Sequence, residues 1–247
     1  MAAVASVDQA PVRGVITSLP LILLPGTLMD GASLRPLVTA LDQAARVELL
    51  GVEDQFDAEI DRLARLAAQP TVWIGHSLGG IAALHLAARQ PACCAALVVL
   101  ASNARPDGPQ GKDSRAKQWA IQDRDGLPEL LRRQLAPVYG IQDSDPLIKD
   151  LQAQAQRIGA ERYRRQLRYA AERPGLLHDP LALGMPVLVL SGSDDPLCPP
   201  TCGEEIIARS PDVHSSHQVL HGAGHLLPLQ APAWCAQHIR HFLTQLA

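Results

Sequence analysis

The sequence predicts an α/β fold in which a mostly parallel, doubly wound sheet carries a helical insertion. Three observations support this prediction. Short apolar runs typical of buried strands alternate with helical patterns along the chain. The alternation stops between about residues 103 and 183, where the pattern is helical only. A G-x-S-x-G motif joins one expected strand to the helix that follows it.

The expected strands are apolar runs rich in β-branched and aliphatic residues. They fall at residues 20–24, 46–51, 71–74, 96–101, 186–191 and 218–220. The clearest expected helices share an apolar stripe or an Ala- and Leu-rich composition, and they span residues 57–68, 79–89 and 234–246. Parallel strands joined by helices are buried on both faces, so we expect helices on both sides of the sheet.

Residues 104–183 are expected to form a helical cap on an α/β core made of residues 1–103 and 184–247. Within this insertion, Asp145 precedes Pro146 as an N-cap precedes a proline at the first helical position. Arg173 and the Pro-Gly pair after it end the helical pattern. An insertion between two strands lies over the carboxyl ends of the sheet, where open α/β sheets bind ligands.

Length and composition exclude several classes of protein. The 247 residues suffice for one large α/β domain, and 47% hydrophobic with 19% charged residues excludes a disordered chain. A net charge of −3 is too near neutral for a dedicated nucleic-acid binder. No apolar run reaches the roughly 20 residues of a membrane helix. Residues 1–20 lack the pattern of a secretory signal, so we expect a cytoplasmic protein with no membrane partner.

The cysteines do not form the pattern of a disulfide framework, because their number is odd and Cys93 and Cys94 are adjacent. Cys198 and Cys202 are four residues apart, but no second pair of Cys or His residues has the spacing of zinc ligands. We therefore expect neither a metal nor an organic cofactor.

Ser77 is the candidate nucleophile, because the motif GHSLG at residues 75–79 follows an expected strand and opens an expected helix. So sharp a turn forces the serine into strained backbone geometry and pushes its hydroxyl out over the sheet edge. Side chains at Gly75 and Gly79 would crowd the strand against the helix. His76 is expected to support this loop rather than act as a base, because adjacent side chains diverge.

A nucleophilic serine needs a histidine base, and that histidine needs a carboxylate to fix its tautomer. His221 and His225 flank a glycine-rich loop after an expected strand, and we prefer His225. Asp194 and Asp195 both follow the strand at 186–191, and both qualify as the carboxylate on that ground. His85 and His238 are expected to be structural and His241 to lie on the surface, and His178, His214 and His217 lie in expected loops with no further signal.

Four motifs resemble, in order, those of the α/β-hydrolase superfamily: PGT at residues 25–27, GHSLGG at 75–80, GSDDPLCP at 192–199 and GAGHLLPLQAP at 222–232. The resemblance implies the fold of that superfamily and a Ser-His-Asp triad. The usual spacing of its acid loop implies Asp195, and its histidine loop implies His225. An oxyanion hole is implied at the backbone N–H groups of Leu78 and Thr27, with Leu28 as the alternative to Thr27.

A small member of this superfamily with a helical cap is similar to carboxylesterases, including the pimeloyl-carrier methyl ester esterases. The resemblance implies hydrolysis of carboxylic esters with small or medium acyl groups, through an acyl-enzyme. A thioesterase or an acyltransferase would use the same triad. Two further alternatives are a C–C bond hydrolase, whose cap often carries more aromatic residues, and a non-catalytic ligand-binding protein, in which the triad is usually damaged.

The insertion also contains a stretch rich in arginine, formed by Arg157, Arg162, Arg164, Arg165, Arg168 and Arg173. Only Glu161 and Glu172 lie between these six arginines, which leaves a local excess of four positive charges. Such a patch can dock an acidic acyl carrier protein or a carboxylate of the substrate. The alternative is an ordinary solvated helix face.

Overall fold

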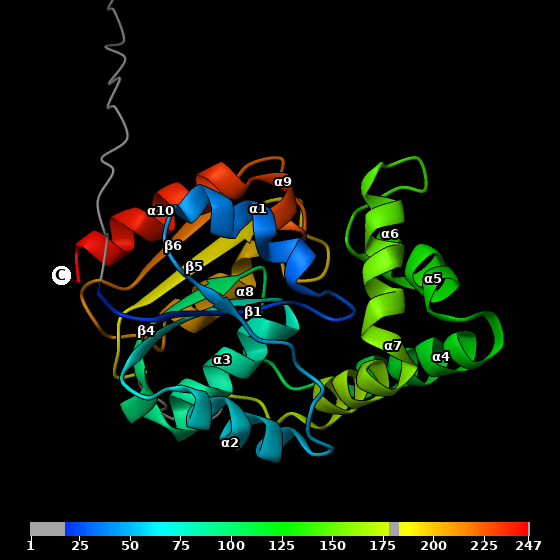
Figure 1. The fold of residues 1–247 in the computed structure, drawn as a ribbon, viewed down its shortest axis with the longest axis horizontal. Coiled ribbons are helices and arrows are strands. Elements are labelled where there is room, and N and C mark those ends of the chain that lie inside the picture. Colours follow the sequence, from blue (N-terminus) through cyan, green and yellow to red (C-terminus); the bar gives the residue numbers. More distant parts are fainter. Residues whose placement is uncertain (1–17, 178–182, 247) are drawn as a thin grey trace, which may run out of the picture.

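The computed structural model describes residues 18–177 and 183–246, which surround a central six-stranded sheet (Figure 1). All described strand pairs are parallel, in the order β2-β1-β3-β4-β5-β6. The strands are β1 Leu21–Leu24, β2 Arg46–Val47, β3 Thr71–His76, β4 Cys94–Leu100, β5 Val187–Gly192 and β6 Ser216–Leu220. The predicted α/β class with a parallel sheet is confirmed.

Helices cover both faces of the sheet, which explains why β1, β3 and β5 are buried along their whole length. One face packs against α2 (Phe56–Leu66), α3 (Leu78–Arg89) and α8 (Pro200–Ile207). The other face packs against α1 (Gly31–Leu41), α9 (Leu227–Gln230) and α10 (Pro232–Thr244). Neighbouring residues of one strand therefore enter different apolar clusters, as Ile22 and Leu23 do.

The chain between β4 and β5 is helical, as the sequence predicts. Its elements are α4 (Pro109–Asp125), α5 (Leu127–Leu130), a π-helical turn (Leu131–Leu135), α6 (Ala136–Val138) and α7 (Leu147–Glu172). These helices stand beside the sheet layers, at the right of Figure 1. They bury an apolar cluster of their own, which Leu28, Met29 and Leu226 join from loops on the sheet side. The division into a core and a cap at residues 104 and 183 stays a prediction, and residues 178–182 lie outside the described part.

Several element boundaries differ from the expected ones, most of them by one or two residues, and three of the differences have a visible local feature. Strand β2 ends at Val47 rather than at residue 51, and the backbone there turns to reach Gly51 with a φ of 90°. Helix α7 begins at Leu147, one residue later than expected, although the Asp145 carboxylate still accepts the Leu147 N–H at 2.9 Å. Helix α10 begins at Pro232, because a proline fits the first helical position.

The expectations for the first residues of the chain, including the absence of a secretory signal, fall largely on residues 1–17, outside the described part. Among the residues that the structure does describe, none of the helices has both the length and the apolar character needed to cross a membrane.

Candidate active site

Ser77 occupies the sharp turn between the end of β3 and the start of α3. Its backbone has φ 52° and ψ −117°, a region that a residue with a side chain rarely adopts. A Cβ on Gly75 would lie 2.3 Å from the Gly79 carbonyl oxygen, and one on Gly79 would lie 2.1 Å from that of Leu24. Glycine is therefore required at both flanking positions, as the sequence indicated. The Ser102 hydroxyl donates to the Ser77 carbonyl at 2.7 Å and braces the turn.

The imidazole of His225 lies between the hydroxyl of Ser77 and the carboxylate of Asp195. Its Nε2 is 2.9 Å from Ser77 Oγ, and its Nδ1 is 2.8 Å from Asp195 Oδ2. The side chains of His225 and Asp195 are fully buried. A carboxylate at Nδ1 keeps the proton on that nitrogen, which leaves Nε2 free to accept the proton of the hydroxyl.

The second oxygen of Asp195 is also satisfied. Oδ1 accepts the backbone N–H groups of Leu197 at 2.8 Å and Cys198 at 2.9 Å. Burial acts to raise the pKa of the Asp195 carboxyl, but the hydrogen bonds from His225 and from these two backbone groups outweigh it and lower the pKa below its usual value. The carboxylate is therefore ionised at neutral pH.

Neither of the two alternative residues takes part in this arrangement. Asp194 is exposed, and its Oδ1 accepts the hydroxyl of Ser193 at 2.6 Å. His221 is exposed on the turn that follows β6. Of the candidates that the sequence left open, the structure brings Asp195 and His225 to Ser77.

Two further aromatic side chains position His225. The buried ring of His76 lies with its Nε2 2.8 Å from the His225 carbonyl oxygen, so it contacts the histidine loop, whereas the sequence predicted support of its own serine loop. Burial lowers the pKa of His76 to about 3, which keeps the ring neutral. Tyr139 stacks on the His225 ring with centroids 5.1 Å apart. Tyr139 was not predictable from the motifs, because it lies in the insertion, far from all of them.

The loop after β1 and the start of α3 supply backbone N–H groups beside Ser77. The Leu28 N–H donates to Gln166 Oε1 at 3.0 Å and is therefore occupied. The N–H groups of Thr27 and Leu78 have no hydrogen-bond partner among the described residues, and both residues line the pocket that contains Ser77. This geometry favours Thr27 over Leu28 as the backbone donor that would form an oxyanion hole together with Leu78.

Comparison with known proteins identifies the family of this chain. Residues 13–238 match the sequence profile of the Alpha/beta hydrolase family. The chain belongs to the α/β-hydrolase family. It is 30% identical over 180 residues to a pimeloyl-[acyl-carrier protein] methyl ester esterase of Neisseria meningitidis serogroup B. That match covers 70% of this chain but only 65% of the length of the relative.

Solved structures of hydrolases share the fold of this α/β hydrolase. A thermophilic esterase from Thermogutta terrifontis, studied with malate bound, superposes with a TM-score of 0.81 at 26% identity, covering 93% of this chain and 91% of that one. A carboxylesterase structure from Nitrososphaera gargenis has a TM-score of 0.76 at 19% identity, covering 95% and 93%, and shows the fold alone. The chain is thus a member of a hydrolase family with esterases among its relatives.

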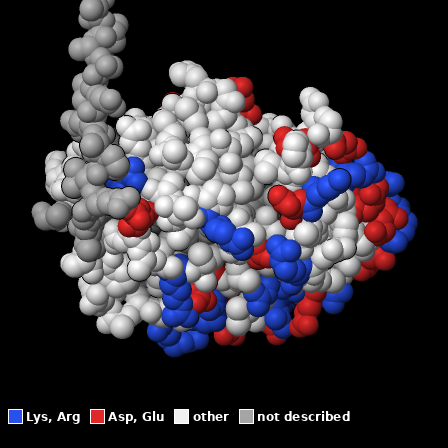
Figure 2. All heavy atoms as spheres, turned by 45° about the horizontal axis from the view of Figure 1, so that its top comes forward, with Lys and Arg blue, Asp and Glu red and all other residues white. Residues whose placement is uncertain are grey.

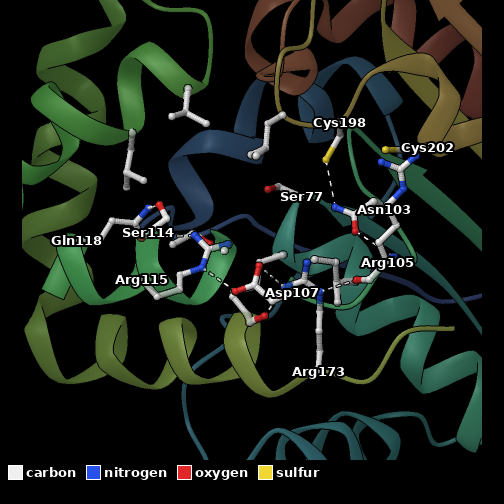
Figure 3. Close-up of a pocket in the computed structure, with 18 of the residues that line it drawn as sticks. Ser77, Asn103, Arg105, Asp107, Ser114, Arg115, Gln118, Arg173, Cys198 and Cys202 are labelled. Atoms are coloured by element: carbon white, nitrogen blue, oxygen red, sulfur yellow. Dashed lines mark hydrogen bonds and ion pairs between the residues drawn. The ribbon is translucent and has the colours of Figure 1, made fainter. Parts of the chain in front are cut away.

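The pocket beside Ser77 has a volume of about 470 Å³ and lies between the sheet and the insertion (Figure 3). Pockets for small ligands measure about 300–1,000 Å³. Thr27, Ser77 and Leu78 line it from the sheet side. Much of the remaining lining is polar, with side chains from α4, from the end of the insertion and from the loop after β4: Asn103, Arg105, Asp107, Ser114, Arg115, Gln118 and Arg173. The motifs indicated nothing of this polar lining.

One group of potential metal ligands occurs within the described ranges, formed by Asp195, Cys198 and His225, with ligand atoms within 4.8 Å of one another. Both ring nitrogens of His225 already face partners, Asp195 on one side and Ser77 on the other. The hydrogen bonds of the site therefore account for this grouping.

Proposed function

We propose that this α/β hydrolase cleaves carboxylic esters of small or medium acyl groups, with Ser77 as nucleophile, His225 as general base and Asp195 as its orienting carboxylate. The observation that carries the proposal is the unbroken line of hydrogen bonds, at 2.8 and 2.9 Å, from the carboxylate through the imidazole to the hydroxyl. Similarity to an esterase at 26% identity and to a methyl ester esterase at 30% identity supports an ester as the substrate.

In the first half of the reaction, Ser77 Oγ attacks the carbonyl carbon of the ester while His225 Nε2 takes the hydroxyl proton. The N–H groups of Thr27 and Leu78 donate to the oxyanion of the tetrahedral intermediate. Collapse of this intermediate breaks the bond to the alcohol, which takes the proton from Nε2 and leaves. Asp195 stabilises the imidazolium that exists between these two proton transfers.

In the second half, a water molecule attacks the acyl-enzyme and gives its proton to His225 Nε2. The new intermediate breaks the bond to Ser77 Oγ, which regains the proton, and the carboxylic acid is released. The geometry supports this cycle because one ring nitrogen faces the serine while the other is fixed by a buried carboxylate.

Hydrolysis of p-nitrophenyl butyrate tests the proposal. Ser77→Ala removes the nucleophile, and we expect kcat to fall about 10⁵-fold or more. Ser144→Ala is the matched control, because Ser144 is exposed in the loop before α7, and its kcat stays at the wild-type value. Turnover by Ser77→Ala within tenfold of wild type contradicts the proposal.

The same line of hydrogen bonds would serve a thioesterase or an acyltransferase. A panel of oxygen esters and thioesters with equal acyl chains, assayed with and without an added alcohol acceptor, separates these alternatives. Under the proposal, the oxygen esters are hydrolysed with the higher kcat/KM, and the alcohol takes up little of the acyl group.

An acyl group attached to a carrier protein is the second candidate substrate, favoured by the name of the relatives that are 30% identical. The arginines of the insertion do not form one free basic face. Arg157 lies 2.6 Å from Asp30, and Arg165 lies 2.9 Å from Asp54. Figure 2 shows both signs of charge interleaved over the insertion side.

Charge reversal tests the carrier-protein candidate. Arg165 and Arg168 are replaced together by Glu, and kcat/KM is measured for a carrier-bound methyl ester and for the methyl ester of a free acid. If a carrier docks there, only the carrier-bound ester loses activity, by about tenfold. Equal values for both substrates in variant and wild type exclude docking at these arginines.

A further inference from the structure

The pocket beside the nucleophile carries an excess of positive charge on the side away from the sheet. Among the described residues, three arginines line the pocket, Arg105, Arg115 and Arg173, together with one carboxylate, that of Asp107 (Figure 3). The guanidinium of Arg105 is neutralised by Glu205 through two hydrogen bonds of 2.8 and 2.7 Å. Arg115 and Arg173 are left to share one carboxylate.

The Asp107 carboxylate does not form a hydrogen bond with either guanidinium. Arg115 Nε lies 3.6 Å from Asp107 Oδ2, and Arg173 Nη1 lies 3.8 Å from Asp107 Oδ1. Both separations exceed the length of a hydrogen bond. Arg115 Nε and Asp107 Oδ2 are buried without a hydrogen-bond partner among the described residues. A buried guanidinium usually meets its carboxylate in a close pair, since desolvating the charge is costly. Donor capacity is therefore left over beside the pocket.

The two arginines are held in place by other groups. Arg173 Nε donates to the Arg105 carbonyl at 3.0 Å, its Nη1 donates to the Ala170 carbonyl, and its side chain is only 6% exposed. Arg115 Nη1 lies 3.4 Å from Gln118 Oε1. Fixed guanidinium groups lose little conformational entropy when an anion binds, which favours binding.

We propose that Arg115 and Arg173 bind a second, anionic group of the ester, a carboxylate, so that the preferred substrates are monoesters of dicarboxylic acids. This inference rests on the proposed ester hydrolysis at Ser77. A carboxylate has two oxygens that can accept from the unused N–H donors of the two arginines. It also neutralises the positive charge that remains because, within the described ranges, Asp107 is the one carboxylate facing them both. Because the side chain of Arg173 is only 6% exposed, water screens a charge pair there less than it does at the protein surface. A phosphate on the ester shares the anionic chemistry, and the experiment separates the two.

The experiment compares kcat/KM for monomethyl adipate, for methyl hexanoate and for a methyl ester of the same length that ends in a phosphate. These three esters share the reacting group and differ at the far end of the chain. We expect wild-type enzyme to prefer the monoester over the neutral ester by about tenfold. A higher kcat/KM for the phosphate ester overturns the assignment of a carboxylate.

Substitutions at the subsite change the preference in opposite directions. Arg115→Gln lowers the ratio of monoester to neutral ester by about tenfold, and Arg115→Lys retains part of it. Asp107→Asn removes the competing carboxylate and raises the ratio. Arg124→Gln is the matched control on the same helix, because Arg124 is exposed and paired with Asp125, and it leaves the ratio unchanged.

Failure of the subsite and failure of the proposed function give different results. If methyl hexanoate is hydrolysed and the monoester is not preferred, the subsite is overturned and the ester hydrolase stands. Calorimetric titration of free adipate into Ser77→Ala protein tests the subsite without turnover. We expect binding that Arg115→Gln weakens about tenfold, and equal binding to both proteins overturns the inference even if no ester is cleaved.

Discussion

The two sides of the pocket pair their charged groups in different ways. On the sheet side, hydrogen bonds of 2.8 and 2.9 Å join Asp195, His225 and Ser77, and the carboxylate and the ring are fully buried. On the insertion side, Asp107 lies 3.6 and 3.8 Å from its two arginines. Under the two proposals, close pairing fixes the groups that transfer protons, whereas loose pairing leaves hydrogen-bond donors for a substrate. The comparison then assigns the reaction to residues on the sheet side and the choice of substrate to residues of the insertion.

Of the substitutions that compare the two sides, replacing the buried carboxylate of Asp195 has the largest expected effect on kcat, because this carboxylate orients His225 on the sheet side of the pocket. In Asp195→Asn, the side-chain amide no longer holds the proton on His225 Nδ1, and we expect kcat for p-nitrophenyl butyrate to fall about 10⁴-fold. Asp194→Asn is the matched control, because the exposed neighbour carries the same charge and keeps wild-type activity. A larger loss in Asp194→Asn than in Asp195→Asn contradicts the assignment.

Low pH is expected to decrease the stability of the sheet side, because two neutral histidines, His76 and His85, are buried there. Burial lowers the pKa of His76 to about 3 and that of His85 to about 4. The unfolded chain takes up these protons near pH 6.5 and the folded chain does not, so stability falls as the pH decreases from about 6.5 toward 4. At pH 5 each histidine lowers the free energy of unfolding by about 2 kcal/mol.

Urea unfolding at pH 7.5 and pH 5.0 measures this loss. His85→Gln removes one of the two buried imidazoles and reduces the difference between the two pH values by about half. Gln142→Ala, at an exposed residue without a titratable side chain in the loop before α7, leaves the difference at its wild-type value. A wild-type free energy that is equal at both pH values contradicts the neutral, buried state of these rings.

The side chain of Gln166 connects the insertion to the sheet side of the pocket, and replacing it has the smallest expected effect on kcat. Its Oε1 accepts the Leu28 N–H at 3.0 Å, and its Nε2 donates to the Leu50 carbonyl at 3.2 Å. Gln166→Leu leaves both backbone groups unpaired, and we expect the free energy of unfolding to fall by about 1–3 kcal/mol. Because Leu28 follows the proposed donor Thr27, kcat also falls, by less than about tenfold. Gln152→Leu is the control at another glutamine of the same helix, half-buried, and it keeps the wild-type kcat. An equal loss of kcat in both variants excludes a role of Gln166 in positioning the loop that carries Thr27.

The sheet and the serine turn were predictable from local sequence. Continuous apolar runs are typical of strands buried on both faces, and the requirement for glycine around Ser77 follows from how closely strand and helix approach. The choice between Asp194 and Asp195 was not decided by position after a strand. It depends on the direction of each side chain, which the N–H groups of Leu197 and Cys198 fix for Asp195.

The polar pocket was not predictable, because it depends on packing between segments far apart in the chain. Arg173 belonged to the expected basic stretch of the insertion, yet its side chain is buried against the carbonyl groups of Arg105 and Ala170. Asp107 and Arg115 belong to no motif or clear apolar stripe in the sequence. Their meeting with Arg173 follows from the path of the loop after β4, which no spacing rule describes.

Labelling with a fluorophosphonate probe, followed by peptide mass spectrometry, tests most directly whether Ser77 is an activated nucleophile. We predict that the probe modifies Ser77 in the wild-type protein and that the Asp195→Asn variant reacts far more slowly at the same position. Modification of a different serine, or labelling of Ser77 at equal rates in both proteins, contradicts activation by His225 and its carboxylate.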